Sequence, residues 1–78
     1  MTQLRKILEL GSSVIVAAKG GWQADSLGFI VDGPEPVNTL QGEDYFYWVQ
    51  FMTPQRDRDN DGPYSKAQIL SRYLTIEV

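Results

Sequence analysis

The chain has 78 residues, enough for one small domain with a limited core, because a chain of this length buries only about two thirds of its unfolded surface. It contains neither cysteine nor histidine, which excludes disulfides, thiol nucleophiles and Cys-ligated zinc, and removes the commonest general base. Ten acidic and seven basic residues give a net charge of −3, which disfavours nucleic acid as a partner because phosphate binding depends on a basic surface.

All apolar runs in the chain are short. The longest, such as residues 14–18 and 45–49, fall far below the roughly 20 residues that a membrane-spanning helix needs, and the first residues lack the apolar core of a signal peptide. We therefore expect one soluble, cytoplasmic domain over residues 1–78, with no membrane partner.

The N-terminal residues predict a short helix within residues 1–11. Thr2 can cap it, Gln3 to Glu9 form its two turns, and Gly11 supplies the C-terminal stop. Its apolar stripe consists of Leu4, Ile7 and Leu8. Because two helical turns are marginal alone, this helix would have to dock on a sheet. The alternative makes Ile7 to Leu10 part of a strand.

Two apolar runs predict the first two strands. Val14 to Ala18 is continuous and rich in β-branched residues, which is typical of a buried strand. Leu27 to Val31 is the second strand, and Gly28 inside it predicts a bulge or a close approach of another backbone. The following segment, Pro34 to Asp44, holds two prolines and predicts a long irregular connection.

The second half of the chain predicts two more strands. Tyr45 to Met52 is the third strand, which ends at Thr53 and Pro54, and the polar stretch Gln55 to Gly62 is a loop. Ser65 can cap one or two helical turns that continue through Ser71. Tyr73 to Val78 then forms the final strand.

These elements predict a mostly β protein, a small and strongly bent antiparallel sheet of four or five strands. Their order, with a glycine-containing loop over Lys19 to Ser26 and a helical turn before the last strand, resembles the SH3-like small β-barrels. That group includes tudor-type, KOW-type and photosynthetic accessory domains. The resemblance covers Ser13 to Val78 and rests on pattern and length. It implies a fold, but such barrels serve as adaptors, nucleic-acid binders and enzyme accessory subunits alike.

The third strand is apolar on both of its faces. Tyr45, Tyr47, Val49 and Phe51 alternate with Phe46, Trp48, Gln50 and Met52, whereas a strand with one buried face alternates apolar with polar residues. A single sheet has one interior, so about half of these rings must be covered by the N-terminal helix, a loop or another molecule. We expect self-association, as a homodimer, or a protein partner at this strand. The alternative is that most of the rings are packed as core.

The loop after the third strand carries the first half of a calcium-binding pattern. Asp57, Asp59 and Asp61 stand at its positions 1, 3 and 5, and Gly62 stands at position 6, where the chain must turn sharply. The second half departs from the pattern, because Gln68 stands where a bidentate Glu should be. The sequence therefore leaves two hypotheses, a weak calcium site or a turn in which aspartates accept backbone N–H groups.

Trp22 lies in a polar loop. We expect its side chain either to contact a ligand or to close the domain as a lid over Leu27 or Val37.

No pair of side chains is placed by the sequence for catalysis, so we expect a non-catalytic protein-binding or self-associating module without a cofactor. The alternatives are a single-stranded nucleic-acid-binding barrel and an oligomer with a ligand or catalytic pocket at its interface. The predicted binding surface consists of Trp22, Tyr45, Tyr47, Trp48 and Tyr64.

Overall fold

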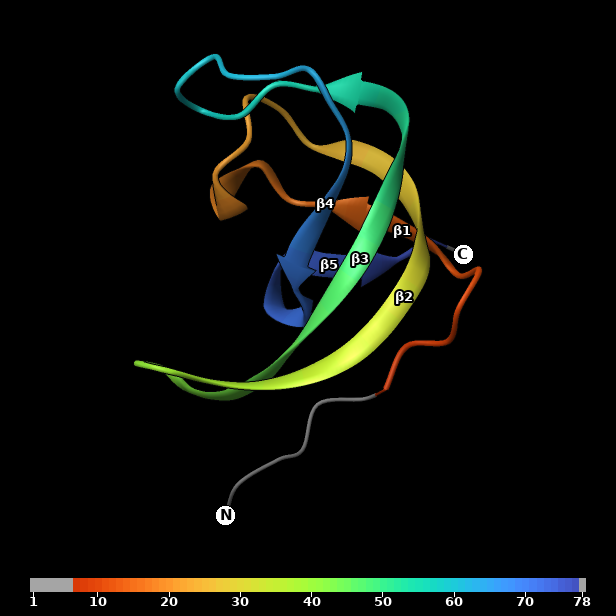
Figure 1. Cartoon of the computed structure of the whole chain (residues 1–78), viewed down its shortest axis with the longest axis vertical. Helices are drawn as coiled ribbons and strands as arrows, with labels where there is room; N and C mark the ends of the chain where they lie inside the picture. Colours follow the sequence, from red (N-terminus) through yellow and green to blue (C-terminus); the bar gives the residue numbers. More distant parts are fainter. Residues whose placement is uncertain (1–6, 78) are drawn as a thin grey trace.

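Five antiparallel strands in one sheet make up the fold in a computed structural model, which describes residues 7–77 (Figure 1). The strands are β1 (Ser13–Val16), β2 (Ser26–Thr39), β3 (Gly42–Gln55), β4 (Tyr64–Leu70) and β5 (Leu74–Ile76). Two short 3-10 helices, η1 (Ala18–Gly20) and η2 (Ser71–Tyr73), follow β1 and β4. The described residues contain no α-helix, and therefore none long and apolar enough to cross a membrane.

The sheet is open and has the strand order β4-β3-β2-β1-β5. The sequence correctly predicted a small antiparallel β protein, but the expected closure into a barrel is not found, because no described ladder joins β4 to β5. β5 has only three residues, and its one partner among the described strands is β1. Trp22 from the β1–β2 loop and Tyr73 from η2 lie beside β4, where a closing strand would have to pair.

β2 and β3 form a long hairpin that projects from the body of the molecule (Figure 1). The prediction of an irregular connection over Pro34 to Asp44 is therefore wrong, since this segment forms the outer half of the hairpin around a turn at residues 40–41. β1 pairs with β2 as far as Phe29, and Gly11 and Ser12 hydrogen-bond the backbone of Ile30. Beyond Ile30, this edge of β2 has no neighbouring strand within residues 7–77. Prolines are tolerated at such an edge, and two register shifts in β2 accommodate them.

The two predicted helices are corrected by the structure. Residues 7–9 are not helical, and the remainder of the helix predicted over Gln3 to Glu9 lies outside the described residues. The helical turns predicted from Ser65 to Ser71 are wrong, because β4 occupies this segment and directs Ile69 into the core opposite Tyr47. A helical turn does precede the last strand, as predicted, but it is the 3-10 helix η2.

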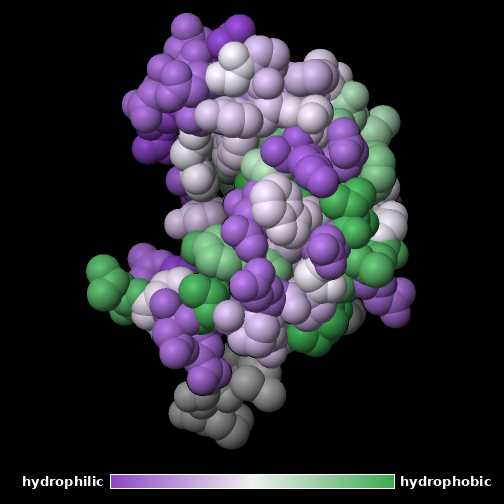
Figure 2. All heavy atoms as spheres, viewed as in Figure 1, coloured by the Kyte–Doolittle hydropathy of each residue, from purple (hydrophilic) through white to green (hydrophobic). Residues whose placement is uncertain are grey.

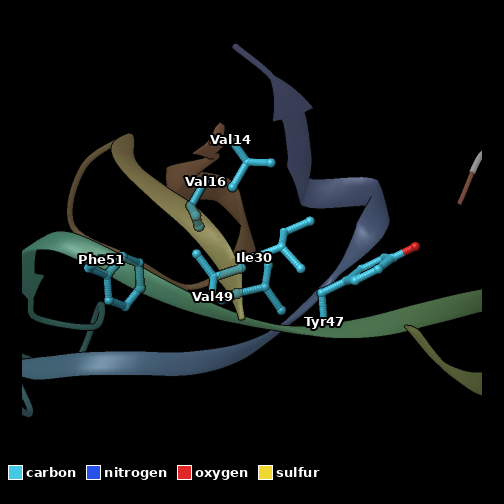
Figure 3. Close-up of a cluster of buried hydrophobic side chains, with 7 residues drawn as sticks. Val14, Val16, Ile30, Tyr47, Val49 and Phe51 are labelled. Atoms are coloured by element: carbon cyan, nitrogen blue, oxygen red, sulfur yellow. The ribbon is translucent and has the colours of Figure 1, made fainter. Parts of the chain in front are cut away.

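The core lies on one face of the sheet (Figure 3). It consists of Val14, Val16, Ile30, Tyr47, Val49, Phe51 and Ile69. Gly28 lets β2 and β3 approach one another, because a Cβ atom at this position would lie 2.6 Å from the carbonyl oxygen of Gln50. The close backbone approach predicted at Gly28 is therefore confirmed.

Candidate functional site

The two faces of β3 differ in burial. Tyr47, Val49 and Phe51 are at most 3 % exposed and point into the core, whereas Trp48 is 37 % and Met52 is 68 % exposed on the opposite face. Lys66 of β4 lies over the ring of Trp48, with its Nζ 5.5 Å from the ring centroid. β3 thus buries one apolar face and leaves the other, which we call the outer face of the sheet, accessible.

A groove of about 330 Å³ runs along the free edge of β4. One wall is β4 itself, and the other is formed by the β1–β2 loop and by η2. Figure 2 shows this side of the molecule hollowed between the loops at the top and the β2–β3 hairpin below. The aromatic residues that line the groove are Trp22, Phe46, Tyr64 and Tyr73.

Trp22 is held between two loops that are distant in the sequence. Its backbone N–H donates to the carbonyl of Ala18 (2.9 Å), and its backbone forms a β-bridge with Asp57. Its ring packs edge-on against Phe51 at 5.0 Å and Tyr64 at 5.9 Å between centroids. Trp22 therefore covers part of the core, as a lid would, but its ring contacts are with Phe51 and Tyr64, whereas the lid was predicted over Leu27 or Val37. Trp22 also forms part of the groove wall.

On the same wall, the ring of Tyr73 in η2 lies against Gly20 of η1. A Cβ atom at Gly20 would come within 3.0 Å of the Tyr73 ring, so the absence of a side chain at Gly20 allows this ring to lie against the loop backbone. Neither Tyr73 nor Phe46 was predicted as a site residue. No sequence signal pointed to Tyr73, which was predicted as the first residue of the final strand, whereas the structure places it in η2.

The loop at Asp57 is organised around a single carboxylate. Asp57 Oδ1 accepts the backbone N–H groups of Asp59 (3.0 Å) and Asp61 (2.9 Å). Arg56 donates from its Nη1 atom to the carbonyls of Asn60 and Gly62 and so ties the loop from the other side. No three acidic side chains within residues 7–77 converge closely enough to hold a metal ion. This geometry supports the turn hypothesis for the calcium-like pattern.

We expect Asp57→Ala to lower the free energy of unfolding by about 1 kcal/mol, because two hydrogen bonds to an exposed loop carboxylate are lost. Asp59→Ala and Asp61→Ala should each change it by less than about 0.5 kcal/mol. Millimolar calcium should leave the melting temperature of the wild type unchanged. Equal effects of all three substitutions, together with a calcium-dependent rise in melting temperature, would instead indicate a metal site.

The five residues of the predicted binding surface do not lie together. Trp22 and Tyr64 meet at the groove, and Tyr45 packs against the core. Tyr47 is fully buried, and its hydroxyl accepts the N–H of Leu8 at 2.8 Å. Trp48 lies on the outer face of the sheet. The structure therefore distributes the five predicted residues among the groove, the core and the outer face of the sheet.

The groove is suited to binding more than to proton transfer. Its described lining is aromatic, aliphatic and amide in character, and Asp57 is the single carboxylate in it. One oxygen of that carboxylate already accepts two backbone N–H groups. At the rim, Gln68 Nε2 donates to Glu35 Oε2 at 3.2 Å, so the surroundings are polar. A mainly apolar groove with a few polar groups is typical of a recognition site.

Searches of protein-family models, curated proteins and solved structures find no match to this chain.

Proposed function

We propose that this chain is a non-catalytic protein-binding module whose groove takes an extended segment of a partner protein. The observation that carries the proposal is that the aromatic groove follows an edge of β4 that no strand within residues 7–77 pairs with. The module would have an SH3-like architecture whose sheet stays open, with the groove along the edge of β4. The strand order and the 3-10 helix before the short last strand support that assignment.

The edge of β4 offers the chemistry that an extended segment needs. Over residues 66–70, which pair with β3 in continuous register, alternate N–H and C=O groups point away from β3, and they would pair with a strand added beside them. Such backbone bonds supply affinity without regard to sequence, and pockets for alternate side chains supply specificity. Here the rings of Trp22, Tyr64 and Tyr73 line the groove beside this edge.

The test is selection of binders from a random-sequence peptide library displayed on phage, followed by amide hydrogen exchange on the complex with a selected peptide. We expect slower exchange at alternate residues of β4, because their N–H groups become hydrogen-bonded to the peptide. Tyr64→Ala should weaken the selected peptide about tenfold, since an aromatic wall of the groove is lost.

Met52→Ala is the matched control, because Met52 is exposed on the outer face and does not line the groove. This variant should bind the selected peptide as the wild type does. The proposal fails if no peptide is selected, or if selected peptides protect the outer face and lose affinity with Met52→Ala alone.

A further inference from the structure

The outer part of the β2–β3 hairpin, residues 36–45, extends past the neighbouring strands, and we call it the arm. β4 pairs with β3 no further out than Phe46, whereas the ladder between β2 and β3 continues to Thr39 and Gly42. At the turn that joins them, the side chain of Leu40 is fully exposed. This leucine buries no apolar surface within its own chain, so it contributes to stability only where a partner covers it.

A polar network holds the arm against η2. Arg72 donates from Nε to Asp44 Oδ2 and from Nη2 to Thr39 Oγ1, each at 2.7 Å. Thr39 Oγ1 donates to the carbonyl of Gly42 (2.8 Å) and accepts the N–H of Gln41 (3.1 Å), which closes the turn at the tip. A two-stranded hairpin alone is only marginally stable, so this network orders the tip and fixes its position relative to η2. An ordered tip loses little conformational freedom when it binds.

The groove opens on the same side of the molecule as the arm. In Figure 2 the hollow lies above the projecting hairpin, and the tip of the hairpin is hydrophobic. The groove has a volume of about 330 Å³, and its walls include the rings of Trp22, Tyr64 and Tyr73, so an aliphatic side chain suits it. Leu40 does not line the groove of its own chain. Since the arm is fixed, a leucine of this kind reaches the groove from another copy.

The charges of the arm and of the groove rim are complementary. Residues 20–55 contain five acidic residues and no basic one, and Glu43 of the arm is exposed. Two exposed cations, Lys19 and Arg58, lie beside the wall formed by the β1–β2 loop. Lys19 belongs to η1 in that loop, and the N–H of Arg58 donates to the carbonyl of Gly21, which lines the groove. An acidic arm therefore approaches this rim with favourable electrostatics.

We propose that the groove binds the arm of a second copy of this chain, with Leu40 between its aromatic walls, and that two copies exchange arms about a two-fold axis. The inference rests on the proposed function, because it takes the same groove and names its occupant. A two-fold rotation that sets one tip in the groove of the second copy also sets the second tip in the first groove, so the pair is closed. Because Arg72 fixes each arm relative to η2, both contacts form without rearrangement. Glu43 then faces Lys19 and Arg58 of the other copy.

The first experiment mixes two defective variants of the full chain and measures their mass by sedimentation equilibrium. We expect a dimer for the wild type at about 100 µM. Leu40→Asp places a charge in the apolar groove and Tyr64→Ala removes a wall, so each alone should raise the dimer dissociation constant at least about tenfold. An equal mixture should associate more tightly than either variant alone, because the Tyr64→Ala arm fits the intact groove of Leu40→Asp. Such rescue also shows that both variants are folded.

Three results would overturn the proposal. A mixture that associates no better than its components would place the interface elsewhere, and a wild-type mass beyond that of a dimer would mean an open chain of copies. The third is a wild type that stays monomeric at about 500 µM. If a selected peptide still protects β4 of that monomer, the proposed function stands and only its occupant is wrong. If no peptide is selected either, both fail.

The second experiment compares two identical charge reversals. Glu43→Lys changes the arm, and Glu77→Lys makes the same change in net charge beyond the end of β5, outside the groove. Glu43→Lys should raise the dimer dissociation constant about fivefold at low salt, because it meets Lys19 and Arg58 of the other copy, and the increase should shrink at about 1 M salt. Glu77→Lys should stay within about twofold of the wild type. Equal effects of the two variants would show that only net charge matters and would remove this contact from the interface.

Discussion

Replacing Tyr47 by Ser should lower the free energy of unfolding by about 4 kcal/mol and leave much of the protein unfolded at 37 °C. Tyr47 is fully buried at the centre of the core, and removing a large buried ring costs about 3–5 kcal/mol through lost burial and the cavity that remains. A domain of this size has a total stability of roughly 4–12 kcal/mol. Equilibrium urea denaturation, followed by tryptophan fluorescence, measures the loss.

Trp48→Ser is the matched control for Tyr47→Ser, because the two rings are adjacent in β3 but point to opposite faces of the sheet. We expect it to cost about 1 kcal/mol or less, since the ring is more than one third exposed. Tyr47→Phe should cost about 1 kcal/mol, because the N–H of Leu8 loses its acceptor. Equal loss from the two Ser variants would mean that both faces of β3 are interior.

The sequence could predict that β3 has two apolar faces but not which of them is buried. Both alternating sets contain aromatic residues, so the pattern of β3 alone carries no preference. The choice is made by register, which sets Val49 opposite Ile30 and Tyr47 opposite Ile69. Those pairings join residues far apart in the chain, and no local pattern reports them.

The errors in the predicted fold have a similar cause. Pro34 and Pro36 disfavour a central strand, but past Phe29 β2 has no β1 residue beside it, and a half-free strand accommodates them. Ser65 is a good helix cap in isolation, and pairing with β3 overrides that preference over Tyr64–Leu70. In both cases tertiary pairing outweighs a local propensity.

The candidate groove could be predicted only in part. Trp22 stood out because a tryptophan in a polar loop needs a contact, and Tyr64 was predicted with it. The meeting of their two loops through the Trp22–Asp57 bridge is a long-range contact that no spacing reveals. The remaining wall depends on η2, which carries Tyr73 and is itself fixed by a buried polar network at Asp44.

Replacing Asp44 by Ala should lower the free energy of unfolding by about 3–5 kcal/mol. The carboxylate is buried, and Oδ2 accepts Nε of Arg72 at 2.7 Å while Oδ1 accepts the hydroxyl of Ser71 and the N–H of Tyr45. Its loss leaves the Arg72 guanidinium, whose side chain is 12 % exposed, without its counter-charge in the interior. Urea denaturation measures the loss.

Arg72→Met gives the second arm of a double-mutant cycle that separates the ion pair from simple packing. Alone it should cost about 3 kcal/mol or more, because Asp44 keeps its buried charge and Thr39 Oγ1 loses the Nη2 donor at 2.7 Å. The double variant, Asp44→Ala with Arg72→Met, removes both charges. Its loss of unfolding free energy should be smaller than the sum of the two single losses by at least about 2 kcal/mol. Because the pair fixes η2, and with it Tyr73 at the groove, the single variants should also weaken a groove-bound peptide more than the double variant does. Additive losses would show that Asp44 and Arg72 act independently, and that η2 is positioned by its apolar contacts alone.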